Sequence, residues 1–460
     1  MASRQESGIG NQESGIGNRE SGWFPVPGAR FPILVVVALL AGCNTPPPAP
    51  VSDGIFRATF DSSKNVEAIV TLRVRCDACA WDKAGSEAVV LKLTLDDRAP
   101  VHLPIVRSGE ADYAVMLGAV GAGKHSLAVV EDPGLTAKAL KGKNAATWTA
   151  TIDQVEPDSD RYVPLSLAPF VHARPDTVGK FTDVPILMWY EIEPAPAGKR
   201  YRYSVIFTNE DGGTPVDRLM ATWGRTTDIE YVYSVEVGDD GTIRGEDMQG
   251  PEHKILPYAG RREGRHPVLW VATENNMVLD KGETKVRYAP APILVNLKDV
   301  SREMVMDTNA WTYEIAAKEL AREGKIADDP PPGKQLIPDP RRYAYLEGCG
   351  TLGNRALTFS VKVNDKWIAA DRGVAEYRIA RDGCFRGAVP LPAGSTVDDV
   401  TAVRVHAHAR KDRPATTPVI FSRLNTLFGL DDRYQPMPGR VHWTGNAQIR
   451  PNTPLEIPIP

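Results

Sequence analysis

The stretch NVEAIVTLRVR, residues 65–75, decides the fold class of this chain. Its apolar side chains fall at every second position: Val66, Ala68, Val70, Leu72 and Val74. Successive side chains of a strand point to opposite faces of a sheet, so this period of two predicts a half-buried β-strand. The globular part of the chain therefore starts as a β-protein.

Further short runs with strand character follow at close spacing up to residue 170. We expect strands at 89–95, 113–117, 126–130, 147–152 and 162–167. Residues 120–125, VGAGKH, supply a turn before an apolar strand, which resembles the late hairpins of immunoglobulin-like sandwiches. Residues 54–170 are therefore predicted to form an immunoglobulin-like β domain.

The rest of the chain is predicted to hold two more β domains. For residues 180–327 we expect a central β-sandwich followed by one helix, which starts near 307–309 and stops at Gly324. The proline-rich stretch 328–333 separates it from a C-terminal β-sandwich at 341–460. The expected strands lie at 183–193, 201–208, 229–237, 267–273, 293–297, 343–346, 357–363, 375–379, 400–408 and 419–424. The predicted fold class is mainly β and multi-domain.

Composition excludes several classes of protein. Hydrophobic residues make up 42% of the 460 and charged residues 24%, which is typical of soluble globular domains and excludes both wholesale disorder and a polytopic membrane protein. Lys+Arg 54 against Asp+Glu 58 gives a net charge of −4, so there is no positive field to hold a polyanion. We expect no nucleic-acid partner.

The N-terminal part, residues 1–42, is predicted to be non-globular. A repeated heptapeptide rich in glycine fills residues 5–22 and cannot bury a coiled-coil seam, and an alternative start at Val26 is one hypothesis for it. Arg30 then precedes the apolar run 31–40, which is too short to span a bilayer. The run ends in Leu-Ala-Gly-Cys at residues 40–43.

This ending resembles the lipobox of bacterial lipoproteins. The resemblance implies that the Cys43 thiol carries a diacylglyceryl group, that the signal is cut before it, and that the membrane is a partner through this lipid. A plain secretory signal or a short anchor is the alternative. Residues 43–53 would be a stiff proline-rich tether. Because Asn44 rather than Asp follows the cysteine, we expect export to the outer membrane, facing the periplasm or the cell surface.

Four cysteines remain after Cys43, an even number in an exported chain, so disulfides are expected. A Cys349–Cys384 bridge would close a 35-residue separation and stabilise the C-terminal domain by about 3–4 kcal/mol. Cys76 and Cys79 follow a strand rather than opening a helix in a βαβ unit, which favours a small disulfide at a turn over a thiol oxidoreductase. A zinc site would need a second pair of ligands, and none lies nearby.

The densest polar grouping lies at residues 223–232, WGRTTDIEYV. Asp228 and Glu230 are two apart on an expected strand, so both carboxylates face the same side and can take a hard cation or share a proton. The loops add oxygens that can reach the same site, from Asn209, Asp211, Asn275, Asn276 and Asp280.

The same stretch resembles the Gly-His-Arg-His-Asp-Trp-Glu-His-Val segment of necrosis- and ethylene-inducing-peptide-like proteins and the related vacuolar-sorting-protein-like β-sandwich domains. The match rests on Gly224, Asp228, Glu230 and Val232, with residues 265–271 similar to a later strand. It implies a divalent cation held by Asp228 and Glu230 in a membrane-active sandwich. Arg225 replaces the family's first His, and a guanidinium pairs with carboxylates but does not ligate metals. A structural cluster of Arg225, Asp228 and Glu230 is therefore favoured over a metal site.

Other catalytic signatures are weak. His406 and His408 share a strand face between arginines and are expected to be an exposed polar face rather than a metal site. The chain has no Gly-x-Ser-x-Gly elbow and no phosphate-binding loop. Several aromatic residues can line a sugar or lipid groove but are more often core: Trp189, Tyr190, Tyr231, Tyr233 and Trp270.

The predicted role is binding or scaffolding at the cell envelope, with an unidentified envelope ligand or protein as partner and with no cofactor. The alternative is a cation-dependent hydrolase or membrane-active domain centred on Asp228 and Glu230.

Overall fold

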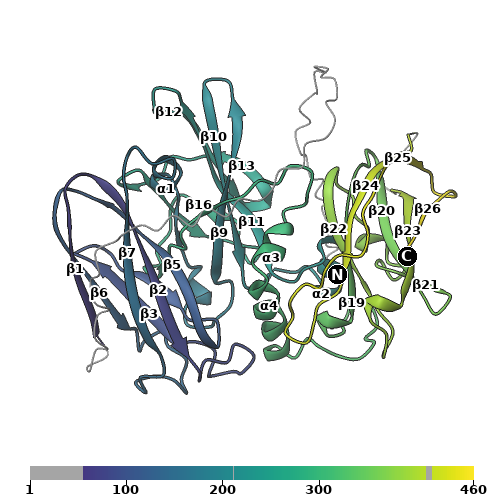
Figure 1. Ribbon diagram of the computed structural model, residues 1–460, viewed down its shortest axis with the longest axis horizontal. Helices are drawn as coiled ribbons and strands as arrows, with labels where there is room; N and C mark the ends of the chain where they lie inside the picture. The colour runs from purple at the N-terminus through teal and green to yellow at the C-terminus, as the bar shows by residue number, and fades with distance from the viewer. Residues whose placement is uncertain (1–54, 211, 411–416, 460) are drawn as a thin grey trace, which may run out of the picture. The chain divides into compact units, whose positions relative to one another are not determined.

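The structure is a computed structural model that describes residues 55–210, 212–410 and 417–459, and these fall within one compact unit. The expected signal, Cys43 and the tether lie outside the described residues. The fold is mainly β. The described residues form six sheets, two from each of three successive stretches of the chain, and their strands are labelled in Figure 1. Within the described ranges, no helix has the length and apolar character needed to cross a bilayer.

The N-terminal strands form a sandwich of seven strands, coloured purple to blue in Figure 1. In β2, Val70, Leu72 and Val74 are fully buried while Arg73 and Arg75 are exposed, which confirms the predicted alternation. The four-to-three division has the strand count of a constant-type immunoglobulin sandwich, but β2 and β5 lie in the other sheet from β1 and β4, which differs from the immunoglobulin arrangement. One sheet has the order β1 (Ile55–Ser62), β6 (Gly123–Glu131), β3 (Val90–Leu95), β4 (Val101–Pro104), and the other β5 (Gly109–Val120), β2 (Val66–Cys76), β7 (Thr147–Val155).

The central pair holds a six-stranded and a five-stranded sheet. Two of its pairings are parallel, β15 with β8 and β18 with β9, and β8 begins at Phe170, ahead of the central strands that the sequence predicted. The six-stranded order is β13 (Lys254–Pro257), β12 (Ile243–Gly250), β11 (Asp228–Gly238), β10 (Gly198–Phe207), β9 (Pro185–Ala195), β18 (Ile293–Leu294). The other is β14 (Arg262–Glu263), β15 (His266–Val271), β8 (Phe170–His172), β17 (Arg287–Tyr288), with β16 (Val278–Leu279) on β15.

The C-terminal strands form two four-stranded sheets around a core that includes Phe359, Phe385 and Phe421. One sheet has the order β22 (Gly383–Pro390), β19 (Tyr343–Thr351), β24 (Val419–Phe428), β25 (Trp443–Ile449). The other is β21 (Lys366–Ala369), β20 (Arg355–Val363), β23 (Val400–Ala409), β26 (Leu455–Pro458).

The helices differ from the sequence prediction at several points. The single expected helix is two, α3 (Met304–Thr308) and α4 (Trp311–Arg322), separated at Asn309. The expected strand at 162–167 is wrong: it is α1 (Tyr162–Ser166), because Pro164 sits in a first turn, where its missing N–H costs nothing. The expected strand at 375–379 is the short η4 (Ala375–Tyr377). The other short helical turns are η1 (Pro175–Thr177), η2 (Pro251–His253), η3 (Pro340–Arg342) and η5 (Val397–Asp399).

Helix α2 (Val216–Trp223) was not predicted. Val216, Leu219 and Met220 follow the i, i+3, i+4 spacing and are buried, and Gly224 ends the helix in the left-handed conformation with φ +61°. A hydrophobic core joins α3 and α4 to β9 and β19 through side chains that include Trp189, Val305, Leu320 and Tyr345. Helices α3 and α4 therefore share a buried core with strands of two different sheets.

Candidate functional site

The Arg225, Asp228 and Glu230 cluster lies where α2 turns into β11. Gly224 makes this turn possible, because a Cβ there would lie 2.8 Å from the Arg386 Cγ atom and the backbone has positive φ. Asp228 pairs with Phe207 in the β10 register and Glu230 with Val205, so the two carboxylates share a face as predicted. All three charged side chains are buried, Asp228 to 1% and Glu230 to 6% exposure.

The charged partner of Arg225 is a residue that the sequence did not indicate. Its Nε lies 3.3 Å from Glu303 Oε1, and its Nη1 bonds the Thr227 carbonyl, whereas the approach to Asp228 Oδ1 is 3.9 Å. Burial opposes ionisation of Glu303, but Arg225 and Arg302 hold its pKa below the usual range. The guanidinium therefore mainly neutralises Glu303 rather than the two strand carboxylates.

Asp228 and Glu230 are instead held by side-chain amides. Asn276 donates from Nδ2 to Asp228 Oδ2 at 3.0 Å, and Gln249 donates from Nε2 to Glu230 Oε2. Burial raises the pKa of Asp228 to about 8, with Glu230 adding repulsion, and burial raises the pKa of Glu230 to about 7. The neighbouring Glu210 is also shifted by burial, to a pKa of about 7. Near neutral pH this is a cluster of partly protonated acids.

These residues do not fit a divalent cation. Amide N–H groups point at both carboxylates, and the position of the resembling family's first His is a buried arginine. In residues 55–210, 212–410 and 417–459, no three or more His, Cys, Asp or Glu side chains converge as metal ligands. Of the expected loop oxygens, Asn276 reaches Asp228, whereas Asn275 accepts from Thr273 and Asp280 from the Ala259 backbone. Asp211 lies outside the described residues.

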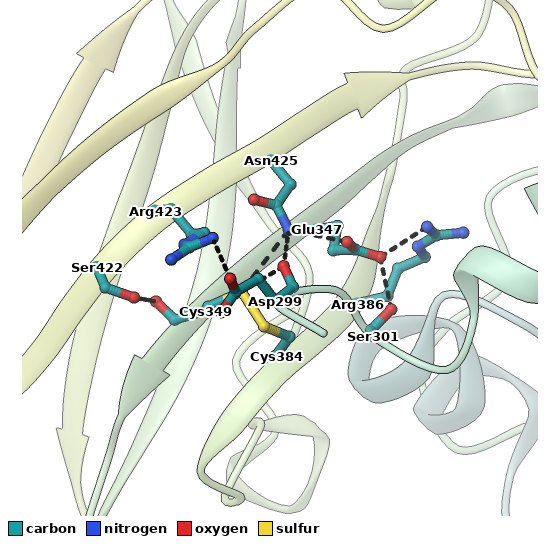
Figure 2. Close-up of a disulfide and its surroundings, with 9 residues drawn as sticks. All are labelled: Asp299, Ser301, Glu347, Cys349, Cys384, Arg386, Ser422, Arg423 and Asn425. Carbon is teal, nitrogen blue, oxygen red and sulfur yellow. Dashed lines mark hydrogen bonds and ion pairs between the residues drawn. A yellow bond between two sulfur atoms is a disulfide. The ribbon is translucent and has the colours of Figure 1, made fainter. Parts of the chain in front are cut away.

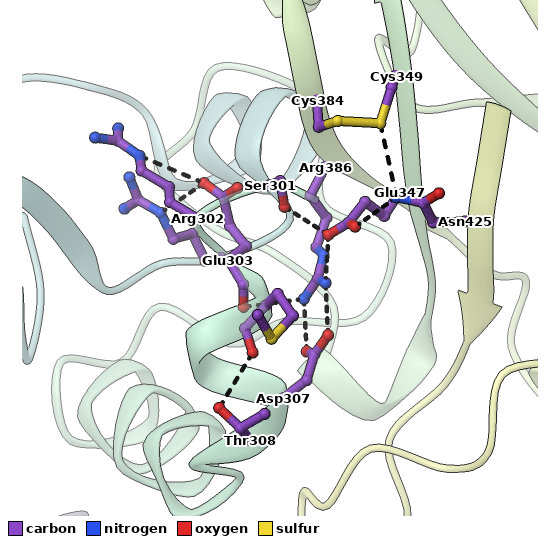
Figure 3. Close-up of polar contacts among 12 residues, drawn as sticks. Ser301, Arg302, Glu303, Asp307, Thr308, Glu347, Cys349, Cys384, Arg386 and Asn425 are labelled. Atoms are coloured by element: carbon purple, nitrogen blue, oxygen red, sulfur yellow. Dashed lines mark hydrogen bonds and ion pairs between the residues drawn. A yellow bond between two sulfur atoms is a disulfide. The ribbon is translucent and has the colours of Figure 1, made fainter. Parts of the chain in front are cut away.

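A second polar cluster, which the sequence analysis missed, centres on Arg386 of β22 (Figure 3). This fully buried guanidinium bonds Asp307 of α3 through both terminal nitrogens at 2.6 Å, and Glu347 of β19 at 2.8 Å. The Tyr313 hydroxyl lies 2.8 Å from Nη1, and the Ser301 hydroxyl donates to Glu347 at 2.6 Å. We call these residues the Arg386 joint, because they tie residues 301–313 to the C-terminal strands.

Both predicted disulfides are present. Cys349 of β19 pairs directly across from Cys384 of β22, beside the Arg386 joint (Figure 2). Cys76 and Cys79 are buried and close a turn at the end of β2, whose two middle residues, Asp77 and Ala78, are exposed. The turn leads to Trp81, whose indole N–H donates to Glu319 of α4 at 2.9 Å. The bridge therefore orders a contact between the first sandwich and the helices. Two disulfides indicate an oxidising compartment outside the cytoplasm.

The remaining sequence candidates are structural. His406 and His408 stack at 4.9 Å, and His406 Nε2 bonds the Pro451 carbonyl. Trp189, Tyr190 and Tyr233 are buried in cores. Tyr231 is half-buried, with the Arg202 guanidinium over its ring.

Trp270 borders a cavity of about 230 Å³. This volume is below the roughly 300–1,000 Å³ of small-molecule sites.

Comparison with known proteins gives no family. No known family and no curated protein matches the sequence. Among solved structures, a ruminal GH26 endo-beta-1,4-mannanase aligns over 31% of this chain and 27% of its own, at 10% identity and a TM-score of 0.17. An alignment this weak carries no argument about fold or function.

Proposed function

We propose that this chain is an exported, lipid-anchored cell-envelope protein whose β-sandwiches have a binding or scaffolding role. The observation that carries the proposal is the apolar run 31–40 followed by Leu-Ala-Gly-Cys at 40–43, with a proline-rich tether behind it. Lipid at Cys43 would hold the folded residues at a membrane, because each buried methylene contributes about 0.8 kcal/mol and lipoproteins carry several acyl chains. The two disulfides support export.

Features of the folded part support binding or scaffolding over catalysis. The buried carboxylates are engaged by amides and arginines, and the polar joints brace sheets and helices against one another. The edge strand β18 exposes Ile293 and Leu294, and neighbouring β9 exposes Ile192. The unpaired backbone groups of an edge strand can pair with another chain, and exposed apolar side chains beside them add contact surface. We propose this edge as the surface that meets the envelope partner.

The anchor is tested with Cys43→Ser. Wild-type protein should incorporate radiolabelled palmitate and partition into the detergent phase with membranes, whereas the variant should stay unlabelled and enter the aqueous phase. Equal partitioning and equal labelling would remove the lipoprotein proposal.

The binding role is tested separately by photo-crosslinking in intact cells. A crosslinker at Leu294 should give a discrete adduct. The control carries the same crosslinker at Lys124, an exposed residue of β6 in the N-terminal sandwich. Identical adduct patterns at both positions would count against the β18 edge.

A further inference from the structure

The two disulfides differ in how far a reductant can reach them. Cys76 and Cys79 are 0% and 1% exposed. In the second bridge Cys349 is 5% exposed, but Cys384 is partly open to solvent. A thiolate reduces a disulfide by direct attack on one sulfur, so access decides which bridge exchanges and at which atom. Of the four bridged cysteines, Cys384 is therefore the residue most open to an external thiolate.

The surroundings of Cys349 suit the sulfur that leaves (Figure 2). The Asn425 amide nitrogen lies 3.6 Å from Cys349 Sγ and carries hydrogens that a thiolate can accept. The Asp299 carbonyl oxygen lies 3.5 Å from the same sulfur and can accept the S–H once the thiolate takes up a proton. Both partners of a reduced Cys349 are therefore already in place beside the intact bridge.

A break in strand register places the Asn425 side chain there. Along the β19–β24 ladder Glu347 pairs with Thr426 and Gly348 pairs with Leu424, so Asn425 is the extra residue of a bulge. Bulges re-aim a side chain that regular pairing would direct elsewhere. The amide reaches Glu347 Oε1 and the Asp299 carbonyl, both at 3.0 Å, as well as the sulfur.

We propose that Cys349–Cys384 is a thiol–disulfide exchange site for a dithiol reductant. One thiolate of the dithiol attacks Cys384 Sγ and forms a mixed disulfide, the Cys349–Cys384 bond breaks, and its electron pair leaves on Cys349 Sγ, which takes a proton from water. The second thiolate of the reductant then attacks its own sulfur in the mixed disulfide and releases Cys384, which is protonated in turn. The bridge gains two electrons and two protons, and the dithiol becomes a disulfide.

Exchange at this bridge acts on the Arg386 joint. The pairs Cys349–Cys384 and Glu347–Arg386 are register neighbours two residues apart, so both lie on one face of the β19–β22 ladder. Asn425 Nδ2 has two hydrogens but three acceptors, namely Cys349 Sγ, Glu347 and the Asp299 carbonyl. While Cys349 is a thiolate it competes for these hydrogens, and once it is protonated its S–H donates to the Asp299 carbonyl that Asn425 also uses. Reduction therefore weakens the hold of the C-terminal strands on the segment that starts at Asp299.

The first test uses the wild-type full chain, with free thiols blocked beforehand. Graded dithiothreitol followed by alkylation and peptide mass spectrometry should show Cys349–Cys384 opening at least about tenfold faster than Cys76–Cys79. In a second arm, reduced glutathione replaces dithiothreitol, and oxidised glutathione is excluded. Because a monothiol stops at the mixed disulfide, the glutathione adduct should be found on Cys384. Equal opening rates for the two bridges, or glutathione found on Cys349, would overturn the proposal.

The second test compares two variants on strand β24. Asn425→Ala removes the donor to the Cys349 sulfur and should slow opening by about fivefold. Ser422→Ala is the matched control, since its hydroxyl bonds the Cys349 carbonyl at 3.0 Å and not the sulfur; its opening rate should stay at the wild-type value. Equal rates in both variants would refute the role of Asn425. If Asn425→Ala does not fold, as circular dichroism would show, the wild-type glutathione map alone decides.

Discussion

Replacing Arg386 with Met should lower the free energy of unfolding more than any other single substitution in the Arg386 joint. Met keeps the apolar stem and removes the guanidinium, which is fully buried and bonded to Asp307 and Glu347. Glu347 is then left almost fully buried with only Ser301 and Asn425 as donors. Breaking a buried pair by removing one partner costs about 3–5 kcal/mol, because the remaining charge is uncompensated.

The assay is equilibrium denaturation followed by tryptophan fluorescence, with circular dichroism as a second probe because several domains need not unfold in one step. Arg161→Met is the control: its pair with Asp153 is solvent-exposed and contributes about 0–1 kcal/mol. Adding Glu347→Gln to Arg386→Met should recover part of the loss, since the buried charge is gone. If Arg386→Met costs no more than Arg161→Met, the reasoning about this joint is wrong.

Three further outcomes are expected. Burial raises the pKa of Asp228 to about 8 and that of Glu230 to about 7, so the folded state binds more protons than the unfolded state. The stability that these two protonated carboxyl groups contribute is complete below their ordinary pKa of about 4. It is lost as the pH rises through about 7 to 8. Asp228→Asn should flatten this decline between about pH 5 and pH 8 in thermal melts, and an unchanged slope would contradict it. Plasma metal analysis should find less than one equivalent of divalent cation, with no change in Asp228→Ala/Glu230→Ala; a full equivalent lost in that variant would restore the cation site. Trp81→Phe should cost about 1–3 kcal/mol in denaturation, since buried Glu319 loses its indole donor; a neutral result would show that this contact does not brace α4.

The period of two in apolar residues predicted strands more reliably than any other sequence signal. The alternation at residues 66–74 predicts β2, and both disulfides were expected from the even number of cysteines and from the spacing within each pair, in a chain expected to be exported. The prediction failed where the local signal was ambiguous. The short run 162–167 is apolar enough for either element, and its proline decided for a helical turn. The apolar residues of α2 follow a 3.6-residue spacing at 216–223, but the segment is only eight residues long and lies between predicted strands, so the local signal is weak.

The candidate site shows the limit of reasoning from sequence. The spacing of Asp228 and Glu230 correctly placed both carboxylates on one face, because side-chain direction along a strand is local geometry. Their chemistry depends on Asn276, Gln249 and Glu303, which come from distant segments. No pattern of neighbouring residues predicts which distant side chains will contact the two carboxylates.

The sequence by itself determined the β class, the cysteines available for bridging and the expectation of a lipid anchor, since each depends on residues adjacent along the chain. Tertiary structure decided which charges meet, most clearly at Arg386, whose partners Asp307 and Glu347 lie 79 and 39 residues away. Burial energies and pKa values follow from that assembly, because desolvation depends on what covers a group rather than on its neighbours in sequence.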